Sequence, residues 1–224
     1  DRFETYLKRI WFSNGIHHHY SNKKHQPEFS SEYFNYLLEA TEVACSEEIK
    51  AVILDPLVQP KKVELDGEKG LVEGSSVNFY GPNVSTEEAK AYFESIKVEG
   101  DRSPVEYGLN SRLVKNASGE VVEETYMIGG LYNDALVEVV KWLNEALQYT
   151  ENDKQAAAMR NLISYYETGD LEKWSLYNIN WVKDVDGDVD YINGFIEVYN
   201  DPLGYTGSYE TIVEIKDFEA SARM

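Results

Sequence analysis

Carboxylates and tyrosines are concentrated between Asp188 and Glu210, and this is the part of the sequence best suited to chemistry. The segment contains Asp188, Asp190, Tyr191, Asn193, Glu197, Tyr199, Asn200, Asp201 and Tyr209. Carboxylates beside tyrosine hydroxyls can hold an ammonium group and donate a hydrogen bond to a carbonyl oxygen. An extended peptide can also add to the edge of a sheet through main-chain hydrogen bonds. These properties predict a site for a peptide N-terminus, although the same residues also fit an ordinary half-exposed strand.

This segment is expected to form a β-hairpin that positions those side chains. Val189 to Tyr199 reads as one strand, Asp201 to Gly204 as a turn, and Tyr209 to Ile215 as the return strand. Asp217 is a candidate N-cap for a further helix. A second hairpin is expected earlier in the chain, from Leu109 to Ile128 around the turn sequence Asn-Ala-Ser-Gly.

Helical periodicity accounts for most of the remaining sequence. The expected helices are Phe3 to Trp11, Tyr33 to Leu54 with a break near Ser46, Thr86 to about Gly100 after a capping box at Ser85, Asn133 to Tyr149, Asp153 to Tyr166, and Asp170 to Trp181. The fold class is therefore α+β, with helices packed around a small antiparallel sheet or barrel made of two hairpins.

The domain expectation is a single α+β lobe over residues 1–224. Within it, residues 1–100 are mainly helical with a loop-rich insert at 55–84, 101–130 form a hairpin, 131–182 are helices and 188–217 form the second hairpin.

The composition restricts the classes of partner. Forty acidic and 21 basic residues give a formal charge of −19, which repels phosphate backbones and anionic lipid, so nucleic-acid and membrane partners are not expected. No run of about 18 apolar residues occurs, so no transmembrane helix is expected. A single cysteine, Cys45, rules out an internal disulfide and suits either cytoplasm or periplasm.

The sequence contains no motif of a catalytic metal site. The chain has no His-Glu-x-x-His sequence, and its four histidines all lie between His17 and His25. Adjacent imidazoles point about 100° apart on a helix, so we expect a hydrogen-bonded histidine cluster rather than a metal site. The alternating aspartates from Asp184 to Asp190 lack the glutamate that a calcium loop needs, because Phe195 stands in its place. No metal ligand is therefore predicted in this chain.

The second hairpin resembles a signature region of the dipeptidyl peptidase III family. Tyr191 to Gly204 reads Tyr-Ile-Asn-Gly-Phe-Ile-Glu-Val-Tyr-Asn-Asp-Pro-Leu-Gly and continues to Gly207 and Glu210. The family region reads roughly Glu-Ser/Thr-Tyr-Ile-Gly-Phe-Ile-Glu-Ser/Thr-Tyr-Arg-Asp-Pro-x-Gly-x-x-Gly-x-x-Glu. Two further segments, Trp11 to Tyr20 and Gly108 to Lys115, are similar to the bacterial branch of this family.

The resemblance implies a concrete function. Family members are two-lobed zinc exopeptidases that remove dipeptides from the N-termini of short peptides, and this chain would be the barrel-lobe portion. Tyr191 would steady the scissile carbonyl as it becomes tetrahedral. An acidic residue just before it would bind the substrate ammonium.

The sequence departs from the family pattern around that tyrosine. The family glutamate falls on Val189, so the ammonium role is assigned to Asp190 first and Asp188 second. Asn193 is an additional residue, which predicts a bulge or register change there. Asn193 and Glu197 complete the expected substrate-binding set, with Glu197 in a supporting position.

The zinc helix of the family lies C-terminal to this hairpin, so the chain is expected to be an excised fragment. Zinc would belong to the full-length parent, none would bind this chain, and the isolated chain would have no peptidase activity. Its expected partners are short peptides with a free N-terminus and the missing zinc-binding lobe of the same polypeptide. The alternatives are a stand-alone peptide-binding module that uses sheet-edge addition, and a structural domain without a ligand.

Overall fold

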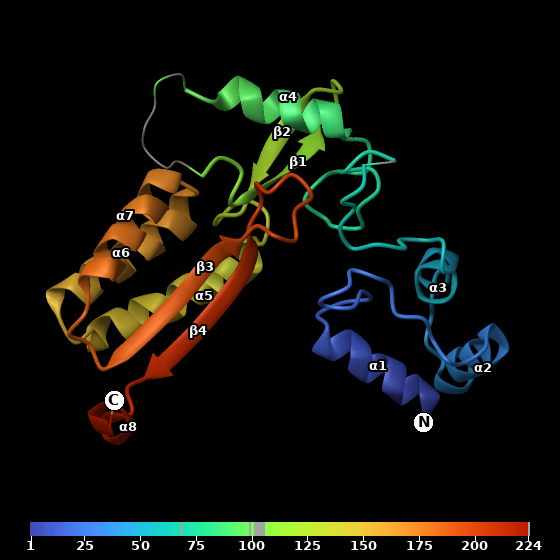
Figure 1. Ribbon diagram of the computed structural model, residues 1–224, viewed down its shortest axis with the longest axis horizontal. Coiled ribbons are helices and arrows are strands. Elements are labelled where there is room, and N and C mark those ends of the chain that lie inside the picture. The colour runs from blue at the N-terminus through green and yellow to red at the C-terminus, as the bar shows by residue number, and fades with distance from the viewer. Residues whose placement is uncertain (68, 99, 101–105, 224) are drawn as a thin grey trace. The chain divides into compact units, whose positions relative to one another are not determined.

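The computed structural model describes residues 1–67, 69–98, 100 and 106–223. The chain divides into two compact units, Asp1–Val77 and Asn78–Met224, and each is described by itself. Figure 1 labels the elements of both units. Within the described ranges, no helix is long and apolar enough to cross a membrane. The expectation of a single lobe stays a prediction.

The described residues of unit 1 form three helices, and each begins at a capping residue that the sequence contains. They are α1 (Arg2–Phe12), α2 (Ser31–Thr41) and α3 (Glu47–Leu54). Asp1 forms a capping box with Glu4, and the hydroxyl of Ser46 accepts the Ile49 N–H, which confirms the predicted break before α3. Residues after α3 are irregular, as the sequence predicts, with an isolated bridge between Lys23 and Lys61.

Aromatic packing joins α1 to α2 in unit 1. Phe3 and Tyr6 of α1 contact Phe29, and Phe34 of α2 stacks against the same ring. Tyr6 and Phe34 are buried, so this face of α1 forms the interior of the unit. The opposite face of α1 remains available for polar contacts.

Unit 2 contains the remaining elements. They are α4 (Thr86–Ile96), β1 (Ser111–Lys115), β2 (Val121–Thr125), α5 (Asn133–Ala146), the 3-10 turn η1 (Leu147–Tyr149), α6 (Asp153–Thr168), α7 (Leu171–Lys183), β3 (Val189–Glu197), β4 (Ser208–Ile215) and α8 (Phe218–Arg223). Residues 101–105 of the predicted first-hairpin segment lie outside the described residues. The described sheets are two antiparallel hairpins, so the predicted α+β class is confirmed.

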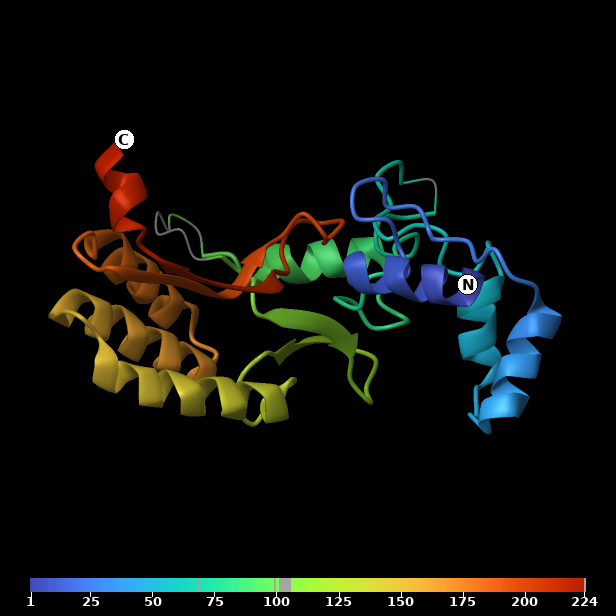
Figure 2. The same ribbon diagram turned by 90° about the horizontal axis from the view of Figure 1, so that it is seen from below.

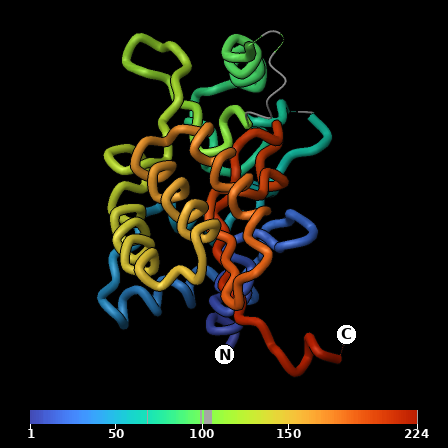
Figure 3. The backbone as a smooth tube through the Cα atoms, turned by 90° about the vertical axis from the view of Figure 1, so that its left-hand side faces the viewer, coloured from blue at the N-terminus to red at the C-terminus, as the bar shows by residue number. Residues whose placement is uncertain are grey.

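The core of unit 2 lies between helices α5, α6 and α7 and the base of the second hairpin. Figures 2 and 3 show α6 and α7 side by side, with α5 next to α6. Leu162, Tyr165 and Tyr166 of α6 are fully buried and pack with Trp174 of α7 and Phe195 of β3. Gly169 ends α6 in the left-handed conformation that glycine adopts without strain, as expected for its stop position.

Strands β3 and β4 pair in a regular antiparallel register that is interrupted once. The partners run from Val189 opposite Ile215 to Phe195 opposite Tyr209, and Glu197 then pairs with Ser208. The extra residue is therefore Ile196. The predicted bulge at Asn193 is wrong in position, because Asn193 pairs regularly with Thr211. The irregularity falls instead at Ile196, near the end of β3, where the side chain packs against the core.

Candidate functional site

Asp190 occupies an exposed position near the start of β3. Its Oδ1 accepts hydrogen bonds from the indole Nε1 of Trp181, at 2.9 Å, and from the backbone N–H of Tyr191, at 2.7 Å. Both bonds use the same oxygen, and no described residue bonds Oδ2, which could therefore accept a hydrogen bond from a ligand. Asp190 is thus a fixed carboxylate that can accept a cation.

Tyr191 lies on the opposite face of β3 from Asp190, as the alternation of a strand requires. Its ring is stacked with Tyr177 at a centroid distance of 6.3 Å, and its hydroxyl is buried without a hydrogen-bond partner among the described residues. Burial, reinforced by Tyr177, Asp184 and Asp190, raises the pKa of Tyr191. The structure therefore keeps this phenol protonated and turned into the packing against α7.

The side chain of Asn193, on β3, links this strand to β4 and α6 through hydrogen bonds. Its Oδ1 accepts from the hydroxyl of Tyr166, while its Nδ2 donates to the hydroxyls of Tyr209, at 2.9 Å, and Thr211, at 3.1 Å. The side chain is fully engaged, so in this arrangement it orders the hairpin and has little hydrogen-bonding capacity left for a ligand.

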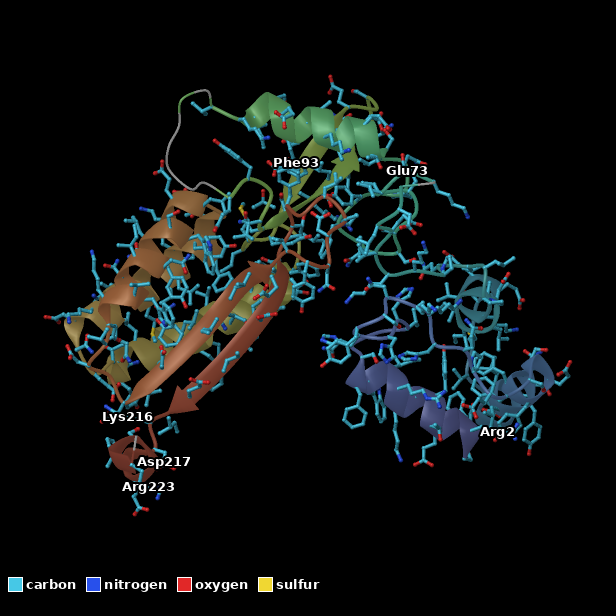
Figure 4. All side chains as sticks on the ribbon, in the orientation of Figure 1. Arg2, Glu73, Phe93, Lys216, Asp217 and Arg223 are labelled. Carbon is cyan, nitrogen blue, oxygen red and sulfur yellow. The ribbon has the colours of Figure 1, made fainter. Side chains whose placement is uncertain are left out.

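Asp188 and Glu197 lie at the two ends of β3. Asp188 is 3.5 Å from Lys216 in a half-exposed ion pair, and Figure 4 shows Lys216 where β4 meets α8. Glu197 is exposed and follows the Ile196 bulge. The structure thus spreads the predicted site residues along the whole strand and over both of its faces.

Helices α6 and α7 close the outer edge of β3. The Lys216 N–H donates to the Asp188 carbonyl, so the backbone of Asp188 points toward β4. Backbone groups alternate in direction along a strand, so those of Val189, Tyr191, Asn193 and Phe195 point away from β4. Glu151, just before α6, accepts the Val189 N–H at 3.0 Å, and Gln155 of α6 donates to the Val189 carbonyl at 2.9 Å.

Three side chains on one side of α7 cover the same edge of β3 further along the strand. Trp181 bonds Asp190, the hydroxyl of Tyr177 accepts a hydrogen bond from the Asn193 backbone, and Trp174 lies so close to Gly194 that an added Cβ would meet its ring at 2.4 Å. Because helix side chains occupy this edge, β3 cannot pair with an added peptide strand there.

The outer edge of β4 is open. By the same alternation, the backbone groups of Tyr209, Thr211, Val213 and Ile215 point away from β3. Within the described ranges, no backbone hydrogen bond from outside the hairpin reaches them. Val213 is 68% and Ile215 76% exposed. In Figure 1, β3 lies between β4 and the α6–α7 pair, so β4 is the outer strand.

Glu214 is a residue that the sequence interpretation missed. It stands directly opposite Asp190 in the register, and cross-strand partners share a face with Cβ atoms about 5 Å apart. Both side chains are exposed. Two like charges in such positions repel each other, and a bound cation would remove the repulsion. Pairing the residues of the two strands outward from the Asp201–Gly204 turn could have identified this pair. The pairing is correct only if the bulge is placed at Ile196.

Asp201 anchors the turn that joins β3 to β4. This buried carboxylate accepts the Tyr80 hydroxyl at 2.7 Å and the backbone N–H groups of Leu203, Tyr205 and Thr206 at 3.0, 2.9 and 2.7 Å. Thr206 donates in turn to the Ser111 carbonyl of β1. These bonds fix the second hairpin against the first.

No group of three or more His, Cys, Asp or Glu side chains in the described ranges could hold a metal ion. The described residues therefore do not fit the zinc that the family resemblance implies.

Comparison with known proteins identifies relatives that match part of this chain. "Dipeptidyl peptidase 3" of Dictyostelium discoideum is 31% identical over 97 residues, which cover 43% of this chain and 14% of that protein. "Dipeptidyl peptidase 3" of Homo sapiens is 31% identical over 94 residues, covering 42% of this chain and 13% of that protein. The matched segment is thus a small part of the length of these relatives.

Two solved structures share the fold. The dipeptidyl-peptidase III from Corallococcus sp. strain EGB superposes with a TM-score of 0.54 at 21% identity, covering 75% of this chain and 28% of that one. The DPP III from Caldithrix abyssi gives a TM-score of 0.53 at 15% identity, covering 100% of this chain and 41% of that one. A sequence profile described as "Peptidase family M49" matches residues 84–224, which contain both hairpins and helices α4 to α8. The chain therefore belongs to peptidase family M49.

Proposed function

We propose that this chain is part of a zinc-dependent exopeptidase that removes dipeptides from peptide N-termini, and that it supplies the hairpin which holds the substrate. Family membership and relatives named dipeptidyl peptidase 3 support the reaction class. The substrate would be a short peptide with a free N-terminus.

The observation that carries the proposal is the pairing of Asp190 with Glu214. Two exposed carboxylates face each other across the hairpin, and Asp190 is already oriented by Trp181. An ammonium group between them would be attracted by both carboxylates and would offset the repulsion between the two negative charges. A blocked N-terminus would lose this attraction, which is the discrimination that an enzyme acting on free N-termini needs. Asp188, held by Lys216, lies one pair further along the same face.

Tyr191 is proposed as the donor to the scissile carbonyl. Its buried hydroxyl makes no hydrogen bond with the described residues, so it retains a donor that a substrate carbonyl could accept. To reach a substrate on the Asp190 face, the ring must turn out of its stack with Tyr177. Asn193 and Glu197 would act by ordering the strand and its bulge.

The parent protein would supply the metal from residues outside this chain, in a second lobe of the same polypeptide. Zinc would activate the water that attacks the peptide bond. The part proposed for this chain is to bind the ammonium group and align the peptide. The isolated chain should therefore bind peptide without hydrolysing it.

Calorimetry with a tetrapeptide tests the binding role. We expect the free-amine peptide to bind and its N-acetyl form to bind roughly tenfold more weakly, because one charge-assisted interaction is lost. Asp190→Asn and Glu214→Gln should remove the difference, whereas Glu219→Gln on α8, a matched loss of charge, should preserve it. Equal affinity for both peptides, or turnover by the isolated chain, would contradict the proposal.

A second candidate, a peptide-binding module that acts by strand addition, is favoured by the open edge of β4. The free backbone groups from Tyr209 to Ile215 could pair with an extended ligand regardless of its N-terminus. Binding that is indifferent to N-acetylation and lost on Val213→Pro, which removes an outward N–H, would favour this module. Absence of any peptide binding would favour a structural domain.

A further inference from the structure

The strand-like loop of unit 1 separates its histidines onto two faces. The His18 N–H donates to the Lys23 carbonyl and the His25 N–H to the Ile16 carbonyl, both at 2.8 Å, with His17 bridged to Lys24 between them. Residues alternate across such a ladder, so His18 and His25 share one face and His17 takes the other. The ring centroids of His18 and His25 are 5.8 Å apart.

The His17 face is structural. His17 Nε2 hydrogen-bonds the Gln59 carbonyl at 2.8 Å, and the buried Lys24 donates to the carbonyls of Asp55 and Val58 at 2.6 and 2.7 Å. These bonds tie the loop to the segment after α3. The hydrogen-bonding capacity of this face is therefore used in holding the loop in place.

The His18 face looks onto α1 and lines an open pocket of about 570 Å³, here called the α1–loop pocket. Its helix side is formed by Thr5, Lys8, Arg9 and Phe12, which are spaced so that they lie along one side of α1. Ser13, His18 and His25 complete it. None of the described residues that line this pocket is acidic, on a chain whose net charge is −19.

The lining groups offer hydrogen-bond donors. His18 Nδ1 accepts the backbone N–H groups of Tyr20 and Ser21, each at 3.2 Å, so in the neutral ring the proton sits on Nε2, which is then a donor. Ser13 Oγ lies 3.0 Å from His25 Nε2 and orients that ring.

Two cations add charge to this donor set. Lys8 contacts Glu4 and Arg9 contacts Glu28, but all four side chains are well exposed, and such pairs are weak in water. Lys8 and Arg9 therefore remain able to attract an anion, and the largely exposed ring of Phe12 offers apolar surface beside them.

We propose that the α1–loop pocket binds a small ligand through a carboxylate or phosphate group, held by Arg9, Lys8 and His18, with any apolar part of the ligand against Phe12. An arginine fork matches either oxyanion geometrically, and a neutral histidine Nε2–H adds a directed donor. The pocket belongs to unit 1, so this binding is independent of the hairpin and of the peptide role proposed for it.

Three probes test the proposal on the full chain. N-acetyl-phenylalanine carries a carboxylate and a ring, its amide carries the ring alone, and inorganic phosphate carries the oxyanion alone. We expect the acid to bind with a dissociation constant on the order of 1 mM or tighter and to shift the imidazole resonances of His18 and His25, and the amide to bind roughly tenfold more weakly. Comparing the acid with phosphate identifies which oxyanion the pocket prefers.

Matched variants locate the site. Arg9→Gln should weaken binding of the preferred anion roughly tenfold, whereas Lys50→Gln, which removes the cation of the Lys50–Glu47 ion pair on α3, should leave it unchanged. Circular dichroism and thermal melts check that both variants fold. Equal affinity for acid and amide, no binding of either anion, or the same loss in both variants would overturn the proposal.

Discussion

Asp190 and Glu214 face each other across the second hairpin, on adjacent strands and in a regular part of the register. The pair is exposed and carries two like charges. Natural sheets usually place opposite charges in such positions, since like charges directly opposite each other are destabilising. The arrangement is therefore better suited to holding a cation than to stabilising the hairpin.

Glu214→Lys should make the chain more stable while it abolishes preference for a free peptide N-terminus. Replacing the repulsive pair by an attractive one should raise the free energy of unfolding by about 0.5 kcal/mol, within the range of cross-strand pairs. Urea denaturation measures this change, and calorimetry measures the loss of peptide preference. Glu219→Lys, the same charge change on α8, is the control, and an equal gain there would show a general charge effect.

Tyr191→Phe should leave stability unchanged or raise it by about 1 kcal/mol. The hydroxyl is buried without a partner among the described residues, so removing it relieves a desolvation cost. Urea denaturation of this chain measures the stability, and peptidase activity would be measured in the longer protein that we propose this chain to be part of. A stable variant with at least about a hundredfold lower kcat would support the carbonyl-donor role. A stable and fully active one would assign Tyr191 to packing.

Asp201→Ala should cost on the order of 3 kcal/mol, because four donors lose a buried charged acceptor at once. Tyr80→Phe removes only one of these bonds and should cost about 1.5 kcal/mol. Thermal or urea unfolding checks the order of the two variants. If Tyr80→Phe were the more damaging, the carboxylate would not be the organising group of the turn.

Unit 1 should lose stability as the pH falls below neutral. Burial lowers the pKa of His17, aided by Lys62, Lys24 and His25 and opposed by its bond to Gln59. Burial, His18 and Arg9 likewise lower the pKa of His25. Because the folded-state pKa values lie below the unfolded ones, the unfolded chain binds protons first. Stability is then fully present above about pH 6.5 and is lost as the pH falls toward the folded-state pKa values.

Urea titrations at several pH values, followed by NMR signals of unit 1, check this dependence. His17→Gln keeps a donor for the Gln59 carbonyl but cannot titrate, so its stability should fall less steeply between pH 7 and pH 5. A slope identical to that of the unchanged chain would exclude His17 as its source.

The sequence predicted most elements because their signals are local. Ser46 and Ser85 begin helices by hydrogen-bonding backbone groups within the same turn, and Gly169 ends one through its own conformational freedom. Asp217 likewise accepts the Ala220 N–H at the start of α8. Such contacts span only a few residues, so their pattern is readable in the chain itself.

Placement of the bulge could not be read in the same way. Comparison with the family motif indicated Asn193, but the structure puts the irregularity at Ile196, because Asn193 is held in register by Tyr166, Tyr209 and Thr211. Those partners come from other elements, and their distance in sequence hides them from any local pattern.

The sequence by itself determined the α+β class and the two hairpins, and it led to the prediction, still to be tested, that Asp190, Asp188 and Tyr191 bind a peptide N-terminus. Only the tertiary structure decided that α7 closes the edge of β3, that the β4 edge stays open, that Glu214 is the partner of Asp190, and that His18 and His25 face α1 while His17 does not. The physical reason is that periodicity assigns a side chain to a face, whereas strand register and helix packing decide what that face meets.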